Sequence, residues 1–93
     1  MTVAVISDEV IQNTTLDIIV DELELDLEPT EVDVHADLID IYGADSLGLI
    51  QVLARVNKEL SIRVPRELAV DLRTVDLLVA QIILIRDGKG GDQ

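Results

Sequence analysis

Aliphatic residues recur at helical spacing after Ser46, and this spacing limits the fold more than any other feature of the sequence. At 100° per residue, five of them fall within roughly a third of the helix circumference. They are Leu49, Val52, Leu53, Val56 and Leu60. This is the pattern of an amphipathic helix with one face in a core, so the chain is expected to be all-α.

Three further segments favour helix, which predicts a small four-helix bundle. The first begins near Ser7, a candidate N-cap, and ends by Pro29. Its expected core face comprises Leu16, Ile19, Val20, Leu23 and Leu27. A short third helix is expected after Pro65, because proline suits a first helical position. Thr74 is expected to cap the last helix, whose spacing is closer to 3.6 than to 2 although its β-branched residues also suit a strand.

The chain is expected to form one small domain over residues 1–93. Its folded core is predicted at about residues 7–86, with a flexible polar tail, DGKGGDQ, at residues 87–93. A long acidic connection, residues 28–45, precedes the second helix. Loops of this length are uncommon in compact domains unless they have a function or contain a helical turn.

Composition excludes several classes of function. The sequence has no cysteine and a single histidine, so disulfides and thiolate or histidine-cluster metal sites are excluded. A net charge of −12 argues against nucleic-acid binding, which needs lysine and arginine side chains to displace counterions from phosphates. The longest apolar run, VDLLVAQIILI, is too short to span a bilayer, and MTVAVISDEV does not resemble a secretory signal. We therefore expect a soluble, cytoplasmic monomer without membrane contacts.

The charges are distributed unevenly along the chain. Residues 1–54 contain 13 of the 19 acids and no lysine or arginine, whereas residues 55–93 contain 6 acids and all 7 bases. The acidic part is either a solvated face or a docking surface for partners with basic patches, since complementary charge speeds association and sets orientation.

The stretch GADSL, residues 43–47, places Ser46 where the acidic loop gives way to the second helix. Ser46 is expected to be the N-cap of that helix, and the same helix start presents its hydroxyl for chemical use. No combination of a nucleophile, a base and an oxyanion donor is apparent, so the sequence gives little support to an enzyme. The tripeptide DSL alone is a weak signal, and its position after a long acidic loop at the start of the second helix strengthens it.

In this context the chain resembles the phosphopantetheine-dependent acyl carrier proteins, from about Ser7 to Arg86. LIDIYGADSL resembles the family's approach to its modified serine, with Leu38 and Gly43 in their usual places. KELSIRVPRELA and DLRTVDLLVAQI are similar to the family's later helices in order and spacing.

The resemblance implies that Ser46 is the attachment point of a 4′-phosphopantetheine arm, transferred from coenzyme A by a phosphopantetheinyl transferase. Asp45 would help to orient the arm or the transferase, and Leu47 would be a docking contact. A helix N-terminus suits a phosphodiester anion. The arm would hold acyl groups as thioesters, so the chain would act as a tether and not as a catalyst.

The second helix departs from the family pattern, in which acids along this helix meet basic partner enzymes. Here Gln51 and Lys58 occupy its exposed side, together with Leu47, and Glu59 is its first acid. We therefore expect partner contacts through the nine acids of residues 21–40 and an apolar patch. The expected contact residues are Leu47, Ile50, Ala54, Arg55, Asp37 and Asp40. Asp37 and Asp40 lack the spacing of an ordered cation loop, and no metal is expected.

The expected partners are an acyltransferase, a ketosynthase or an acyl-loading ligase of a polyketide or related secondary pathway, such as antibiotic biosynthesis. The departures in the second helix favour such a pathway over housekeeping fatty-acid synthesis. A peptidyl or aminoacyl carrier is the close alternative, although Ala44 and Asp45 before the serine favour the acyl type. An acidic helical adaptor without an arm is the alternative from another class.

Overall fold

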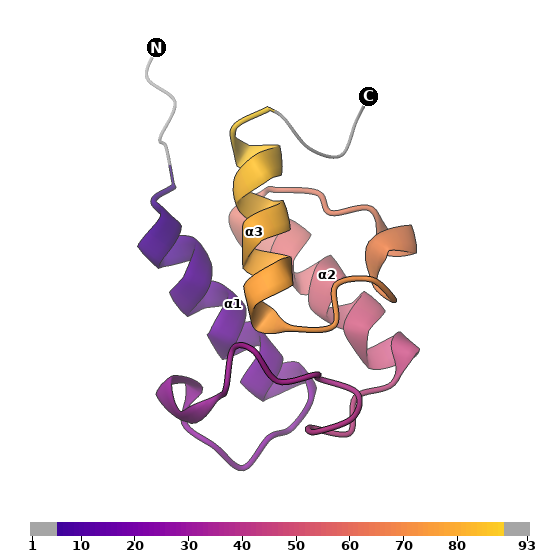
Figure 1. Cartoon of the computed structure of the whole chain (residues 1–93). Helices are drawn as coiled ribbons and strands as arrows, with labels where there is room; N and C mark the ends of the chain where they lie inside the picture. The colour runs from indigo at the N-terminus through magenta and orange to yellow at the C-terminus, as the bar shows by residue number, and fades with distance from the viewer. Residues whose placement is uncertain (1–5, 89–93) are drawn as a thin grey trace.

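Three α-helices enclose one aliphatic core in the computed structural model, which describes residues 6–88. The helices are α1, Asp8–Glu22, α2, Ser46–Leu60, and α3, Val75–Arg86. Two single turns of 3₁₀ helix, Pro29–Glu31 and Arg66–Leu68, lie in the connections. α1 packs against both α2 and α3 (Figure 1). No strand occurs among the described residues, so the all-α prediction is confirmed.

Two predicted helix caps are confirmed. The hydroxyl of Ser7 accepts a hydrogen bond from the backbone N–H of Val10 at 3.1 Å, at the start of α1. The hydroxyl of Thr74 does the same for Leu77 at 3.1 Å, at the start of α3. Both caps satisfy a backbone donor that the helix itself leaves without a partner.

α1 is shorter than predicted, because it ends at Glu22 and not near Pro29. Glu24 has a φ of 54°, a left-handed conformation that ends the helix, and Pro29 instead opens a 3₁₀ turn. The core face was also drawn too narrowly. Ile11 and Ile18 are fully buried in addition to the predicted Ile19, because α1 contacts two helices and must bury a wider face.

The predicted short third helix forms only as a 3₁₀ turn, so the bundle has three α-helices and not four. The backbone N–H groups of Leu68 and Ala69 bond to carbonyls three residues earlier, those of Pro65 and Arg66. The chain then turns towards α3 and is held there. The carbonyl of Arg73 accepts a 2.7 Å hydrogen bond from the N–H of Leu38 in the long connection.

The long connection before α2 is anchored and not loose. Leu38 is fully buried, and the N–H of Asp76 donates to the carbonyl of Val34 at 3.0 Å. Half-buried Tyr42 reaches back across the loop, where its hydroxyl accepts the N–H of Asp33 at 2.8 Å. These contacts fix the start of α2 against the rest of the bundle.

None of the helices in residues 6–88 is long and apolar enough to cross a membrane.

Candidate functional site

α2 begins with a cap supplied by Asp45 and not by Ser46, which corrects the predicted cap. Gly43, with a φ of 75°, turns the chain, and buried Ala44 donates its N–H to the carbonyl of Leu38 at 2.9 Å. Asp45 then takes the extended N-cap conformation, and its carboxylate accepts the N–H of Gly48 at 2.8 Å. Aspartate and serine are comparable caps, so the sequence alone could not separate them.

Ser46 is therefore the first helical residue, exposed and without a capping role. Asp45 uses the first-turn N–H groups of Gly48 and Leu49, through its carboxylate and its carbonyl respectively. The N–H groups of Ser46 and Leu47 have no partner among the described residues, as expected for the first positions of a helix. A phosphate on the Ser46 oxygen would face these donors at the positive end of the helix dipole. The residues present fit a phosphodiester at this position.

Gly48 allows the end of α1 to approach the start of α2. A Cβ at this position would lie 3.1 Å from Cδ2 of Leu23 and 3.2 Å from Oδ1 of Asp45, tighter than ordinary packing. Glycine weakens a helix interior, and the reason for it here, the closeness to Leu23, depends on tertiary structure. A shallow pocket of about 300 Å³ lies beside it, lined in part by Tyr42 and Gln51.

The predicted apolar patch follows one face of α2 from the site. Leu47 is 61% exposed, Ala54 is exposed and Ile50 is partly buried. Each successive member lies three or four residues along the chain, so the three side chains share one side of the helix. Sequence spacing alone correctly placed Leu47 away from the core.

Arg55 was predicted as a partner contact, but its guanidinium is held within the fold. It lies 2.8 Å from Asp21, 2.7 Å from Glu22 and 2.7 Å from Glu59. Hydrogen bonds to Asp21, then to Glu22 and Glu59, raise the pKa of Arg55 above its ordinary value. Arg55 therefore joins the end of α1 to α2, and it does not extend the apolar patch.

Asp37 is likewise used within the fold. Its carboxylate accepts the N–H groups of Ile39 at 2.8 Å and Asp40 at 3.0 Å, and it lies 2.9 Å from Nε of Arg73. The N–H of Asp40, followed by the Arg73 side chain, holds the pKa of Asp37 below its ordinary value. Asp40 lies 3.6 Å from Arg73 and stays largely exposed. Within residues 6–88, no three acids or histidines gather to hold a metal ion.

An exposed serine on a capped helix start, in an acidic three-helix bundle, defines a class of carrier domain. The family described as "Phosphopantetheine attachment site" matches residues 6–82, and the chain belongs to this family.

Two curated relatives are acyl carrier proteins. That of Bdellovibrio bacteriovorus is 39% identical over 59 residues, which cover 63% of this chain and 73% of the relative. That of Amoebophilus asiaticus is 33% identical over 69 residues, which cover 74% of this chain and 84% of the relative. The chain is thus a carrier of the acyl carrier protein type and not an enzyme. Its family implies a 4′-phosphopantetheine group, a phosphopantetheinyl transferase and acyl-handling enzymes as partners.

Proposed function

We propose that Ser46 carries the 4′-phosphopantetheine arm and that the chain presents acyl thioesters on it to enzymes of a polyketide or related pathway. The observation that carries this proposal is that Asp45, and not Ser46, caps the start of α2. Asp45 caps the helix through Gly48, which leaves the exposed Ser46 hydroxyl free to react. Ser46 also lies within the residues that match the family.

Attachment is a transfer onto the serine oxygen. A bond forms between Oγ of Ser46 and the β-phosphorus of coenzyme A, while the bond from that phosphorus to the anhydride oxygen breaks and adenosine 3′,5′-bisphosphate leaves. The Ser46 proton passes to a base of the transferase, since the Ser46 hydroxyl makes no hydrogen bond to a side chain within residues 6–88. The chain contributes a fixed hydroxyl and the free N–H groups of Ser46 and Leu47, which favour the resulting anion. The arm supplies a terminal thiol that holds the acyl group.

Docking is proposed to use the apolar face of α2 together with exposed acids of the long connection. Leu47, Ile50 and Ala54 would enter the partner's interface, and Asp40 is an exposed acid of the connection. An acyltransferase, a ketosynthase or an acyl-loading ligase would bind there. The exposed side of α2 carries Gln51 and Lys58 where a fatty-acid carrier is expected to carry acids, which supports a dedicated secondary pathway.

One experiment separates the carrier from an adaptor without an arm. The purified chain is incubated with coenzyme A, magnesium and a broad-specificity phosphopantetheinyl transferase, and its intact mass is measured. We expect one arm per chain. An unchanged mass with every transferase tried would favour the adaptor. A peptidyl carrier would gain the same arm, so loading is compared next, with acyl-loading and aminoacyl-loading enzymes.

A further inference from the structure

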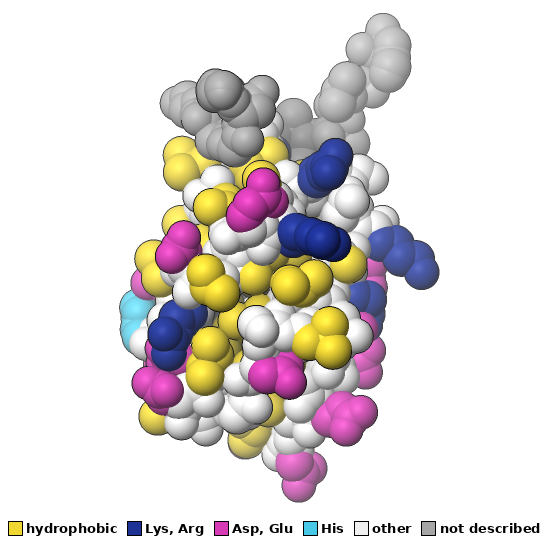
Figure 2. All heavy atoms as spheres, turned by 90° about the vertical axis from the view of Figure 1, so that its right-hand side faces the viewer, with side chains coloured by type: hydrophobic (Ala, Val, Ile, Leu, Met, Phe, Trp, Pro, Cys, Tyr) yellow, Lys and Arg dark blue, Asp and Glu magenta, His cyan; other side chains and the backbone are white. Residues whose placement is uncertain are grey.

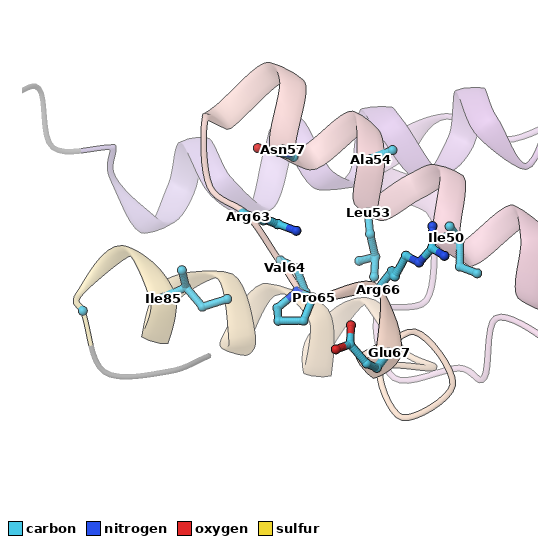
Figure 3. A pocket seen from close by; sticks show the side chains of 11 residues that line it. Ile50, Leu53, Ala54, Asn57, Arg63, Val64, Pro65, Arg66, Glu67 and Ile85 are labelled. Atoms are coloured by element: carbon cyan, nitrogen blue, oxygen red, sulfur yellow. The ribbon is translucent and has the colours of Figure 1, made fainter. Parts of the chain in front are cut away.

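An open groove of about 730 Å³ runs along α2 and shares Ile50 and Ala54 with the apolar patch. Its walls are α2, the irregular link of residues 61–65, the second 3₁₀ turn and the end of α3 (Figure 3). Its apolar lining includes Ile50, Leu53, Val64, Pro65 and Ile85. Such a lining suits a short hydrocarbon chain.

Two arginines border this groove. Arg63 precedes Val64 and Pro65, and the side chain of Arg66 extends towards Ile50 on α2 (Figure 3). Glu67 is the one acid among the lining residues. In the space-filling view, hydrophobic side chains occupy the centre of this face, and most of its lysine and arginine side chains lie above and to the right of them (Figure 2).

These arginines differ from the other three in the described part of the chain. Arg55, Arg73 and Arg86 each lie within 3.0 Å of at least one carboxylate oxygen. Arg63 and Arg66 are exposed and have no acid within 4.0 Å among residues 6–88, although acids outnumber bases 19 to 7 in the sequence. Two unpaired guanidinium groups beside an apolar groove complement a ligand that is apolar along its length and anionic at its end.

The groove lies within reach of Ser46. Ile50 is four residues along α2 from Ser46 and Asn57 is eleven, so the groove extends from about 6 to about 16 Å along the helix axis at 1.5 Å per residue. An extended phosphopantetheine arm spans about 20 Å, judged from the same bond lengths that give an extended peptide its reach. A folded-back arm can therefore bring its acyl group into the groove.

We propose that this groove binds arm-borne acyl groups that end in a carboxylate, with Arg63 and Arg66 as the carboxylate-binding residues. The inference rests on the proposed attachment at Ser46 and adds the chemical class of the cargo. The hydrocarbon part of the acyl group contacts Val64, Pro65 and Ile85, and its terminal carboxylate pairs with the arginines. Selectivity for this class over neutral acyl groups follows from the positive edge of the groove.

The test compares two acyl groups of equal length that differ at one end. A broad-specificity transferase attaches the glutaryl arm or the pentanoyl arm from its coenzyme A thioester to ¹⁵N-labelled protein. Intact mass first confirms one arm per chain, and amide chemical shifts are then measured against the unacylated arm. We expect glutaryl to shift the amides of residues 63–67 at least threefold more than pentanoyl, with the difference shrinking in 0.5 M salt.

The double variant Arg63→Gln with Arg66→Gln should lose the glutaryl effect. The variant Gln12→Glu with Asn13→Asp is the matched control, since it makes the same net charge change on exposed α1 positions and should retain the effect. Equal shifts with both acyl groups would show a purely apolar groove and overturn the inference. An attached arm that shifts neither set of amides would also overturn it, and leave Ser46 attachment standing. Failure to attach any arm would contradict the proposed function as well.

Discussion

The guanidinium of Arg55 lies 2.7 Å from the carboxylate of Glu22, an ion pair that joins the end of α1 to the middle of α2. Asp21 and Glu59 approach the same guanidinium, at 2.8 and 2.7 Å. The Arg55 side chain is 29% exposed, so water screens these contacts only in part. One guanidinium thus pairs with three carboxylates, of which two lie at the end of α1 and one lies on α2.

Replacing Arg55 by Gln should destabilise the fold, because Asp21, Glu22 and Glu59 would then repel one another without a counter-charge. We expect a lower urea midpoint with an unchanged slope. Lys58→Gln is the control, since it removes the same charge from an exposed position of the same helix. Equal midpoints for the two variants would contradict a structural role of Arg55.

Capping at the start of α2 predicts that substitutions of two adjacent residues, Asp45 and Ser46, differ in their effect on stability. Asp45→Ala removes the acceptor of the Gly48 N–H and should lower the free energy of unfolding by about 1 kcal/mol. Asp45→Asn keeps an acceptor for this N–H, so its free energy of unfolding should fall much less. Ser46→Ala should change stability by less than about 0.5 kcal/mol, as for an ordinary surface residue. Urea unfolding measures all three, and a larger loss for Ser46→Ala than for Asp45→Ala would restore Ser46 as the cap.

Asp37 predicts a pH dependence of stability. Its folded-state pKa is lowered, first by the N–H of Asp40 and then by Arg73, so its carboxylate stabilises the fold above the unfolded pKa of about 3.9. This contribution is lost as the pH falls through the folded-state pKa. Asp37→Asn imitates the protonated acid. The stability gap to the native sequence should therefore be full at pH 6–7 and close below about pH 4.

Unfolding by urea across this pH range measures the gap. Asp17→Asn is the control, because Asp17 is exposed on α1 and makes no ion pair or side-chain hydrogen bond within residues 6–88. A gap for Asp37→Asn that is constant from pH 7 to pH 3 would show that its carboxylate is not preferentially ionised in the fold.

Thr15 offers a stabilising substitution. Its side chain is fully buried in α1, and its hydroxyl oxygen has no hydrogen-bond partner among the described residues. Thr15→Val replaces this hydroxyl by a methyl group of similar shape, and we expect the free energy of unfolding to rise by about 1 kcal/mol. Partly buried Thr14 provides the control, since Thr14→Val should change the free energy of unfolding less. A loss of stability in Thr15→Val would indicate that the hydroxyl does have a partner.

Periodic spacing predicted the parts of the fold that a single helix face determines. The core stripe of α2, from Leu49 to Leu60, and the start of α3 after Thr74 are as expected. The end of α1 was missed, because the left-handed conformation of Glu24 carries no glycine or proline signal. The segment after Pro65 has a helical composition, but it forms only a 3₁₀ turn before the chain is held through Arg73.

At the site, the sequence placed Ser46 at the helix start and Leu47 on the exposed side. It assigned the cap to Ser46 and not to Asp45, since the two are neighbouring residues of comparable capping ability. It placed Arg55 among the partner contacts and missed its ion pair with Asp21, because Asp21 lies 34 positions earlier and only the packing of α1 on α2 brings them together. The groove beside Arg66 likewise depends on tertiary structure.

The central claim is that the hydroxyl of Ser46 receives the arm, and intact mass after the transferase reaction tests it most directly. Ser61→Asn is the matched control, since Ser61 lies at the other end of α2 with a φ of 57°, which asparagine tolerates. We predict one added arm on the native chain and on Ser61→Asn, and no added mass on Ser46→Ala. An arm that persists on folded Ser46→Ala would contradict the claim.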